Sequence, residues 1–109
     1  MVTLDKIRAY TDRIVREFHP DKIILFGSYA EGNPGAESDV DLLVILPFKG
    51  KGTYKSLEIL DRLKTDIPID LIARTPEQLA ERLAVNDFFL RAVMEKGTIL
   101  YEVPHGRMD

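Results

Sequence analysis

Cysteine and tryptophan are absent from this 109-residue chain, and none of its apolar runs is long. The absence of cysteine excludes a disulfide-bonded scaffold and a metal site built on thiolates. A membrane-spanning helix needs about 20 consecutive apolar residues, so we expect no contact with membranes. The first residues are polar and follow a helical pattern, which is not the pattern of a signal peptide and favours a cytoplasmic location.

An excess of positive charge is missing too, because the formal net charge is −3 at pH 7. Proteins that bind duplex nucleic acid usually present a basic face. Here the basic side chains gather only in a small spot at Lys49 and Lys51. We therefore expect a small ligand or a protein partner rather than nucleic acid.

Apolar residues make up 45% of the chain and charged residues 30%, which is the balance of a folded globular protein. A chain of this length has room for a single hydrophobic core. We predict one domain over residues 1–103 and a short C-terminal tail over residues 104–109.

Helical periodicity alternates with short apolar runs along the chain. Thr3 can cap a first helix, His19-Pro20 ends it, and Thr75-Pro76 starts a later one. The predicted helices cover residues 4–18, 53–65 and, as one or two helices, 76–96, and the predicted strands cover residues 22–26, 39–46, 68–73 and 98–101. The loop between the first two strands is too short for a crossover helix, so these strands should be antiparallel neighbours. This order predicts an α/β-type layered domain in which helices cover a small sheet.

The helix predicted over residues 53–65 carries three leucines at helical spacing. Thr53 is the expected cap, and Leu57, Leu60 and Leu63 are expected to face the sheet.

Two aspartates, Asp39 and Asp41, open the second predicted strand. Side chains alternate along a strand, so both carboxylates lie on one face, about 7 Å apart along the backbone. Without a counterion they would repel each other and raise each other's pKa. A hard divalent cation such as Mg²⁺ relieves that repulsion, since it takes carboxylate and phosphate oxygens as ligands.

A third acid, Asp70, interrupts the apolar run of the third predicted strand. It could be a solvated strand residue, but a buried aspartate is costly unless it is paired or bound to a metal. If the third strand lies beside the second, Asp70 can face the same site as Asp39 and Asp41. Three carboxylates on adjacent strands can hold two metal ions roughly 3.5–4 Å apart, as in two-metal phosphoryl and nucleotidyl transfer.

The Gly27-Ser28 turn follows the first predicted strand and precedes a short helical turn. Such a turn presents backbone N–H groups and a hydroxyl to an anion, and Gly27 lets the backbone approach a phosphate closely. Taken alone, a Gly-Ser turn or an Asp-x-Asp pair is commonplace. In this order, the two predict phosphate on one side of a site and metal on the other.

The order Gly27-Ser28, ten residues, then Asp39-Val40-Asp41 resembles the nucleotidyltransferases of the DNA polymerase β superfamily. The fuller pattern, GSxARGxxxxxSDxDLxV, resembles the minimal nucleotidyltransferase branch, and Ser38, Leu42 and Val44 match it as well. The resemblance covers the whole chain. It implies a mixed α+β nucleotidyltransferase fold, with a small mixed β-sheet of core strand order 1-2-3 and helices on one side.

The resemblance also implies a Mg²⁺-dependent enzyme that transfers a nucleoside monophosphate, AMP from ATP, to a hydroxyl group and releases pyrophosphate. Asp39, Asp41 and Asp70 would be the catalytic acids and the ligands of two Mg²⁺ ions. Asp70 would also help to activate the attacking hydroxyl.

The nucleotide contacts implied by the resemblance come from Gly27, Ser28 and Ser38, the first two at the β- and γ-phosphates. Minimal family members are commonly encoded beside a helical HEPN-domain protein. In such pairs the nucleotidyltransferase acts as an antitoxin and can adenylylate a tyrosine of the HEPN toxin. We therefore expect a HEPN-type partner and a homo- or hetero-oligomer.

Glu31 stands where the family usually has arginine, which removes a positive charge near the phosphates. The alternative function is therefore a non-catalytic or weakly catalytic antitoxin that works by docking on its helical partner. Phe88, Phe89 and Val93 could form that contact, or they could pack in the core. A transferase of small molecules would need an added acceptor domain, for which the chain leaves little material.

Overall fold

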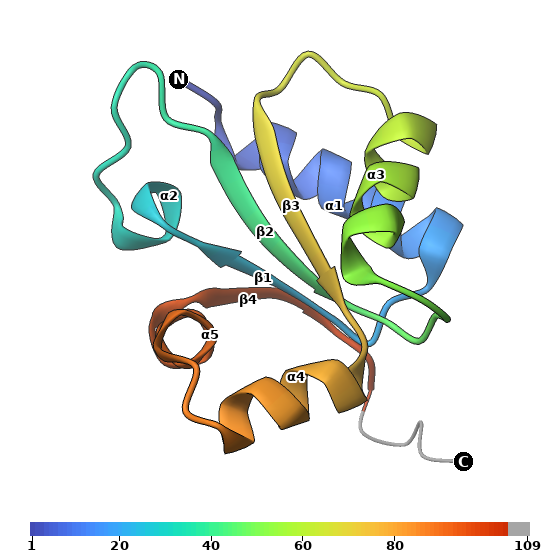
Figure 1. The fold of residues 1–109 in the computed structure, drawn as a ribbon. Helices are drawn as coiled ribbons and strands as arrows, with labels where there is room; N and C mark the ends of the chain where they lie inside the picture. The colour runs from blue at the N-terminus through green and yellow to red at the C-terminus, as the bar shows by residue number, and fades with distance from the viewer. Residues whose placement is uncertain (105–109) are drawn as a thin grey trace.

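In the described part of the chain, four strands form one mixed sheet in the order β3-β2-β1-β4, as Figure 1 shows. The strands are β1 (Lys22–Phe26), β2 (Val40–Ile45), β3 (Ile69–Arg74) and β4 (Thr98–Glu102). Strand β1 pairs antiparallel with both β2 and β4, whereas β2 pairs parallel with β3. The predicted antiparallel pair and the core order 1-2-3 are therefore confirmed.

Five helices surround this sheet in the computed structural model, which describes residues 1–104. They are α1 (Leu4–Phe18), α2 (Ser28–Glu31), α3 (Gly52–Arg62), α4 (Pro76–Ala84) and α5 (Phe88–Lys96). Helix α1 has the predicted bounds, and the Thr3 hydroxyl accepts the N–H of Lys6 as its cap. The predicted tail, residues 104–109, lies outside the described residues apart from Pro104. None of the helices within residues 1–104 is long and apolar enough to cross a bilayer.

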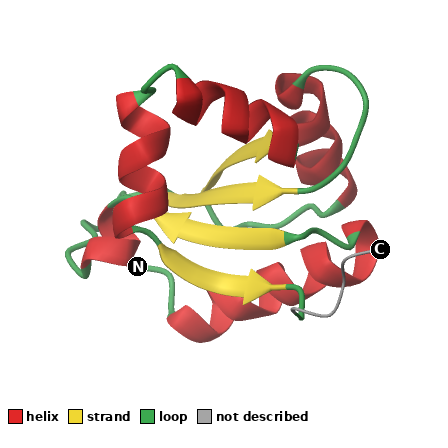
Figure 2. Cartoon of the chain, turned by 90° about the horizontal axis from the view of Figure 1, so that it is seen from below, coloured by secondary structure: helices red, strands yellow, loops and turns green. Residues whose placement is uncertain are grey.

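Helices cover both faces of the sheet, α1 and α3 on one and α4 and α5 on the other (Figures 1 and 2). The expectation of helices on one side is therefore wrong. The reason lies in β2, whose residues after Asp41 are all buried and apolar, so that both of its faces need cover. A fully buried aliphatic side chain contributes roughly 1.5–3 kcal/mol, which makes two covered faces favourable.

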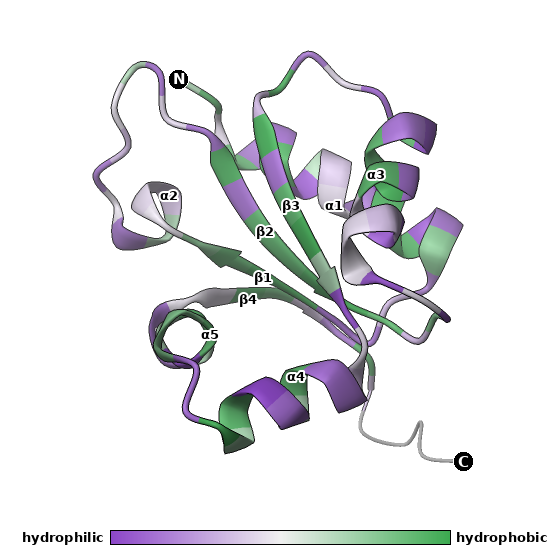
Figure 3. Cartoon of the chain, viewed as in Figure 1, coloured by the Kyte–Doolittle hydropathy of each residue, from purple (hydrophilic) through white to green (hydrophobic). Residues whose placement is uncertain are grey.

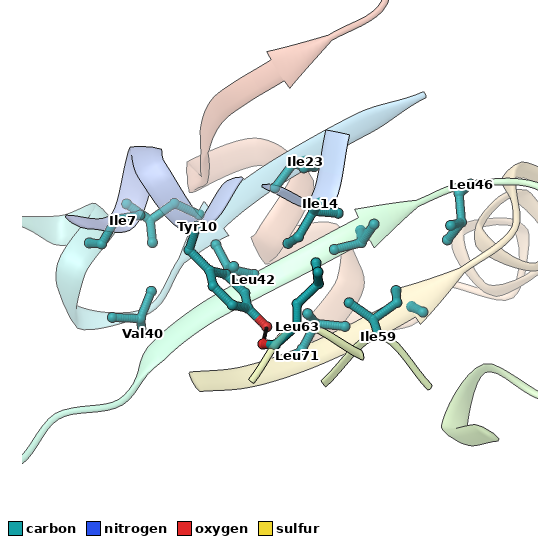
Figure 4. Packing of buried hydrophobic residues seen from close by; sticks show 13 residues of the cluster. Ile7, Tyr10, Ile14, Ile23, Val40, Leu42, Leu46, Ile59, Leu63 and Leu71 are labelled. Carbon is teal, nitrogen blue, oxygen red and sulfur yellow. Dashed lines mark hydrogen bonds between the residues drawn. The ribbon is translucent and has the colours of Figure 1, made fainter. Parts of the chain in front are cut away.

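The larger of the two cores lies between the sheet and helices α1 and α3 (Figure 4). Figure 3 shows that the strands are largely hydrophobic, while the helices carry hydrophilic residues along part of their surface. Tyr10 is the one buried aromatic ring of this core among residues 1–104, and its hydroxyl donates to the carbonyl of Leu63 at 2.9 Å. Burial raises the pKa of the Tyr10 phenol, and the nearby Arg13 guanidinium partly opposes this.

Helix α3 differs from its prediction in its bounds and in one of the three leucines expected to face the sheet. Leu63 is buried and Leu60 packs against the core as predicted, whereas Leu57 does not. The helix begins at Gly52, so Lys51 rather than Thr53 holds the N-cap position. The side chain of Leu57 is 58% exposed. The buried residues of the helix are Ser56 and Ile59. The Ser56 hydroxyl donates to the Gly52 carbonyl and accepts the N–H of Ala73 on β3. This pair of hydrogen bonds fixes the rotation of the helix against the sheet, which leucine spacing alone does not reveal.

Candidate functional site

The predicted acids lie at the end of the sheet where β1 ends and where β2 and β3 begin. Asp41 is the second residue of β2, and Asp70 is the second residue of β3. In the parallel register of these strands Asp41 stands directly beside Asp70, and on its other side it faces Phe26 of β1. Hydrophilic bands near the starts of β2 and β3 mark this place in Figure 3. The prediction that the third strand lies beside the second is confirmed.

The alternation of side chains along β2 also follows the prediction. Val40, Leu42 and Val44 belong to the core under α1 and α3, whereas Leu43 and Ile45 belong to the core under α4 and α5. Asp41 therefore faces the side of the sheet that α4 and α5 cover. Asp39 precedes the strand and is exposed, as is Asp70, whereas Asp41 is half-buried.

The three carboxylates interact electrostatically. Partial burial raises the pKa of Asp41, and the negative charges of Asp70 and Asp39 raise it further. Burial and like charges both disfavour the ionised carboxylate, so a negative charge on Asp41 raises the free energy of the folded chain. A bound cation would offset that cost.

Gly27 joins the two halves of the motif in space. Its φ of 73° is one that residues with a Cβ rarely adopt, and a Cβ at this position would overlap Asp41 Oδ2. The Gly27 carbonyl accepts the N–H groups of Ala30 and Glu31, each at 3.1 Å, which ties the turn to α2. Glycine is thus required both by the backbone conformation and by the carboxylate that lies against it.

The two serines of the motif have different surroundings. Ser28 begins α2, and its hydroxyl makes no hydrogen bond to any other residue of the described chain. The Ser38 hydroxyl accepts the N–H of Gly35 at 2.8 Å and so closes the loop that precedes β2. A hydroxyl that accepts one bond can still donate another. The predicted nucleotide contacts of Gly27, Ser28 and Ser38 stay predictions.

The fit of Mg²⁺ to this place can be judged from the donors. Within residues 1–104, no three acidic or histidine side chains already converge on a point that could hold a metal ion. The carboxylate oxygens of Asp39, Asp41 and Asp70 are nevertheless ligands of the type that Mg²⁺ takes. A bound cation would also relieve the repulsion of Asp41 by the other two negative charges. The donors therefore fit Mg²⁺ by their chemistry, whereas the binding of Mg²⁺ by Asp39, Asp41 and Asp70 and the two-ion arrangement stay predictions.

A cleft of about 230 Å³ includes Gly27 in its lining and opens between the end of β1 and helices α2 and α5. Its rim is partly aromatic, because the rings of Phe26 and Phe89 meet edge to face with their centroids 5.6 Å apart. The lining residues are Phe26, Gly27, Ala30, Glu31, Phe89, Ala92, Val93, Lys96 and Gly97. Sequence reasoning missed this cleft, since Lys96-Gly97 signals only the end of a helix.

Phe88, Phe89 and Val93 were expected either to contact a partner or to pack in the core, and their exposure in α5 distinguishes these alternatives. Val93 is 4% exposed and packs in the core, whereas Phe88 is 77% exposed and Phe89 52%. The prediction of core packing is thus confirmed for Val93 and wrong for Phe88. Phe88 remains available for contact with a partner, together with the neighbouring Val85, which is 67% exposed.

Comparison with known proteins adds two sequence matches. The family model described as "Nucleotidyltransferase domain" matches residues 4–100. The Methanocaldococcus jannaschii protein MJ0604, whose name proposes a protein adenylyltransferase activity, is 35% identical over 85 residues. That match covers 73% of this chain and 77% of the relative.

Solved structures share the fold at lower sequence identity. A Sulfolobus solfataricus protein described as a proposed nucleotidyltransferase superposes with a TM-score of 0.63 at 17% identity, over 91% of this chain and 79% of that one. A toxin-antitoxin complex with AMP-PNP gives 0.58 at 22% identity, and a mutant of the MntA-HpeT toxin-antitoxin complex gives 0.55 at 19%. Each of the latter two covers 88% of this chain and 73% of the other. At these identities the likeness concerns the fold.

Proposed function

Because this chain belongs to the nucleotidyltransferase domain family and is a nucleotidyltransferase, we propose that it transfers AMP from ATP to a hydroxyl group of a partner protein. The observation that carries the proposal is the contact between the Gly27 turn and the Asp41 carboxylate, with Asp70 beside it. That contact puts the proposed phosphate-binding turn against the proposed metal-binding acids. The structure of a related fold with AMP-PNP supports an adenine nucleotide as the substrate.

The three acids would hold the Mg²⁺ ions that accompany the nucleotide. When bound, Mg²⁺ neutralises phosphate charge and polarises the bonds of the α-phosphate. Asp70 is exposed and lies beside the half-buried Asp41, so an acceptor hydroxyl can reach it from solvent. In this proposal Asp70 takes the hydroxyl proton while the acceptor oxygen bonds to the α-phosphorus. The bond from that phosphorus to the bridging oxygen then breaks, and pyrophosphate leaves with the electron pair.

The Gly27-Ser28 turn would hold the β- and γ-phosphates. Gly27 presents its backbone without a side chain between it and the nucleotide, and the Ser28 hydroxyl has no partner elsewhere in residues 1–104. The Ser28 hydroxyl is therefore free to contact phosphate oxygens. Ser38 would support the site from the loop before β2 and could donate its own hydroxyl proton.

A protein is the favoured acceptor. The name of the MJ0604 relative proposes a protein adenylyltransferase, and two proteins of similar fold were solved as toxin-antitoxin complexes. We propose in finer detail that the acceptor is a tyrosine of a helical HEPN-type toxin, which this chain neutralises as an antitoxin. The exposed Phe88 and Val85 would contribute to docking.

Radiolabelled ATP tests the reaction directly. The protein is incubated with Mg²⁺, the product of the neighbouring gene and ATP labelled at either the α- or the γ-phosphate. Transfer of the α-label alone supports AMP transfer. Transfer of the γ-label would indicate a kinase reaction, and the absence of any transfer would contradict the proposal.

A second candidate function is an antitoxin that binds its partner without modifying it. The observation in its favour is Glu31, an acidic residue that lines the cleft beside the proposed phosphate site. An Asp41→Asn variant that still neutralises the toxin in cells, with no label on the toxin from wild type, would favour this function over catalysis.

A further inference from the structure

The cleft beside Gly27 holds one basic side chain among its lining residues, Lys96 at the end of α5. Glu31 lines the same cleft, and Asp41 lies against Gly27. A triphosphate bound at the Gly27-Ser28 turn would thus meet carboxylates around the sheet edge. Lys96 is the lining residue whose charge can attract it.

The fold brings Lys96 to this place through the pairing of β4 with β1. Leu25 pairs with Thr98 in the antiparallel register, so the residues just before Thr98 run back beside Phe26 and Gly27. Gly97 packs so closely on β1 that an added Cβ would crowd the Ile24 side chain and the Leu25 carbonyl. The end of α5 is therefore fixed against the end of β1, and Lys96 projects from that junction.

Lys96 also has no counterion within the described part of the chain. The ion pairs found among residues 1–104 do not include Lys96 or Glu31. Lys96 is exposed, so its ammonium group is hydrated and mobile until a ligand binds. A free lysine ammonium is a common phosphate-binding group in proteins, acting as a point charge with three donors.

We propose that Lys96 binds the β- and γ-phosphates of the nucleoside triphosphate from across the cleft, opposite the Gly27-Ser28 turn. This inference rests on the proposed function, because it names a further residue for the same nucleotide. The Lys96 charge would also offset the negative charge of Glu31, which lines the same cleft. The plain alternative is that Lys96 only complements the negative end of the α5 dipole.

Nucleotide affinities separate these two roles. Binding of ATP and of AMP, each with Mg²⁺, is measured by calorimetry for wild type, Lys96→Gln, Lys96→Arg and the matched control Lys64→Gln. Lys64 lies beyond α3 and pairs with Asp61 on the surface, so its variant makes the same charge change away from the cleft. We expect Lys96→Gln to weaken ATP binding roughly tenfold and AMP binding much less, since a hydrogen bond to a charged group contributes enough for such a factor. Lys96→Arg should keep most of the affinity.

Equal ATP affinity in Lys96→Gln and wild type would overturn the inference while leaving the proposed function intact. If wild type binds neither nucleotide, the proposed function itself fails. A thermal unfolding scan detects the dipole role, which lowers the melting temperature without a selective loss of ATP binding. As a measurement on the unaltered chain, ATP should protect Lys96 from an amine-reactive reagent more than it protects Lys64. Equal protection would contradict the proposal.

Discussion

The Cα of Gly27 lies against the carboxylate of Asp41, so closely that no side chain fits between them. The two residues are separated along the sequence by α2 and a loop, yet they meet at one corner of the sheet. This contact explains why the motif needs both parts. The turn and the acid are one structural unit, and a change in either should disturb the other.

Gly27→Ala should therefore damage both stability and activity. The positive φ and the overlap with Asp41 together should lower the free energy of unfolding by roughly 1–3 kcal/mol, and the displaced carboxylate should lower AMP transfer. Urea denaturation and label transfer measure the two effects.

Gly32→Ala is the matched control, because Gly32 also has a positive φ, 81°, but has open space where its Cβ would lie. It should lose about 1 kcal/mol from backbone strain and keep its activity. If both variants lose activity equally, the contact with Asp41 is not what the site requires.

Asp41→Asn should stabilise the chain at pH 7 in the absence of Mg²⁺. The pKa of Asp41 is raised in the folded state, by burial and by Asp70 and Asp39, so the folded state favours the protonated carboxyl. The stabilisation from that proton is present at acidic pH and is lost as the pH rises through the raised pKa. The advantage of the variant should consequently shrink as the pH falls through that value, which denaturation curves across the acidic range would show. Identical pH dependence in the two proteins would contradict the electrostatic account of the acids.

Glu31→Gln should strengthen ATP binding, by roughly two- to fivefold at low salt, because it removes a negative charge from the cleft wall. The gain should fade as salt is added. Glu37→Gln, in the exposed loop before β2, makes the same charge change outside the cleft lining and should leave the affinity unchanged. Calorimetric titration of ATP into the three proteins measures this. A weaker affinity in Glu31→Gln would mean that the carboxylate itself contacts the nucleotide.

The sheet corner could be predicted from sequence because local rules decide it. The aliphatic run after Asp41 predicts a strand that carries this acid on one face, and the short loop predicts antiparallel pairing with β1, although Asp39 precedes the strand in the structure. The place of Asp70 beside Asp41 follows from the predicted neighbouring strands. The cost of burying an aspartate did not decide it, because Asp70 is exposed.

The rest depends on tertiary contacts that the sequence pattern does not encode. Leucine spacing suggested that Leu57 faces inward, but the hydrogen bonds of Ser56 to Gly52 and Ala73 rotate α3 differently. The cleft was missed because it needs α5, α2 and β1 together, and Lys96 has no signal of its own in the sequence. Helices cover both faces of the sheet because both faces of β2 are buried. The family resemblance implied helices on one side and did not take this burial into account.

The most direct test of the central claim compares the rate of AMP transfer from α-labelled ATP by wild type, Asp41→Asn and Asp61→Asn. Asp61 lies on the exposed surface of α3, so its variant controls for the loss of one carboxylate away from the site. The account predicts that Asp41→Asn lowers the rate at least about 100-fold, as expected when a group central to the chemistry is removed, while Asp61→Asn stays within about twofold of wild type. An Asp41→Asn variant that transfers AMP as fast as wild type would contradict the account.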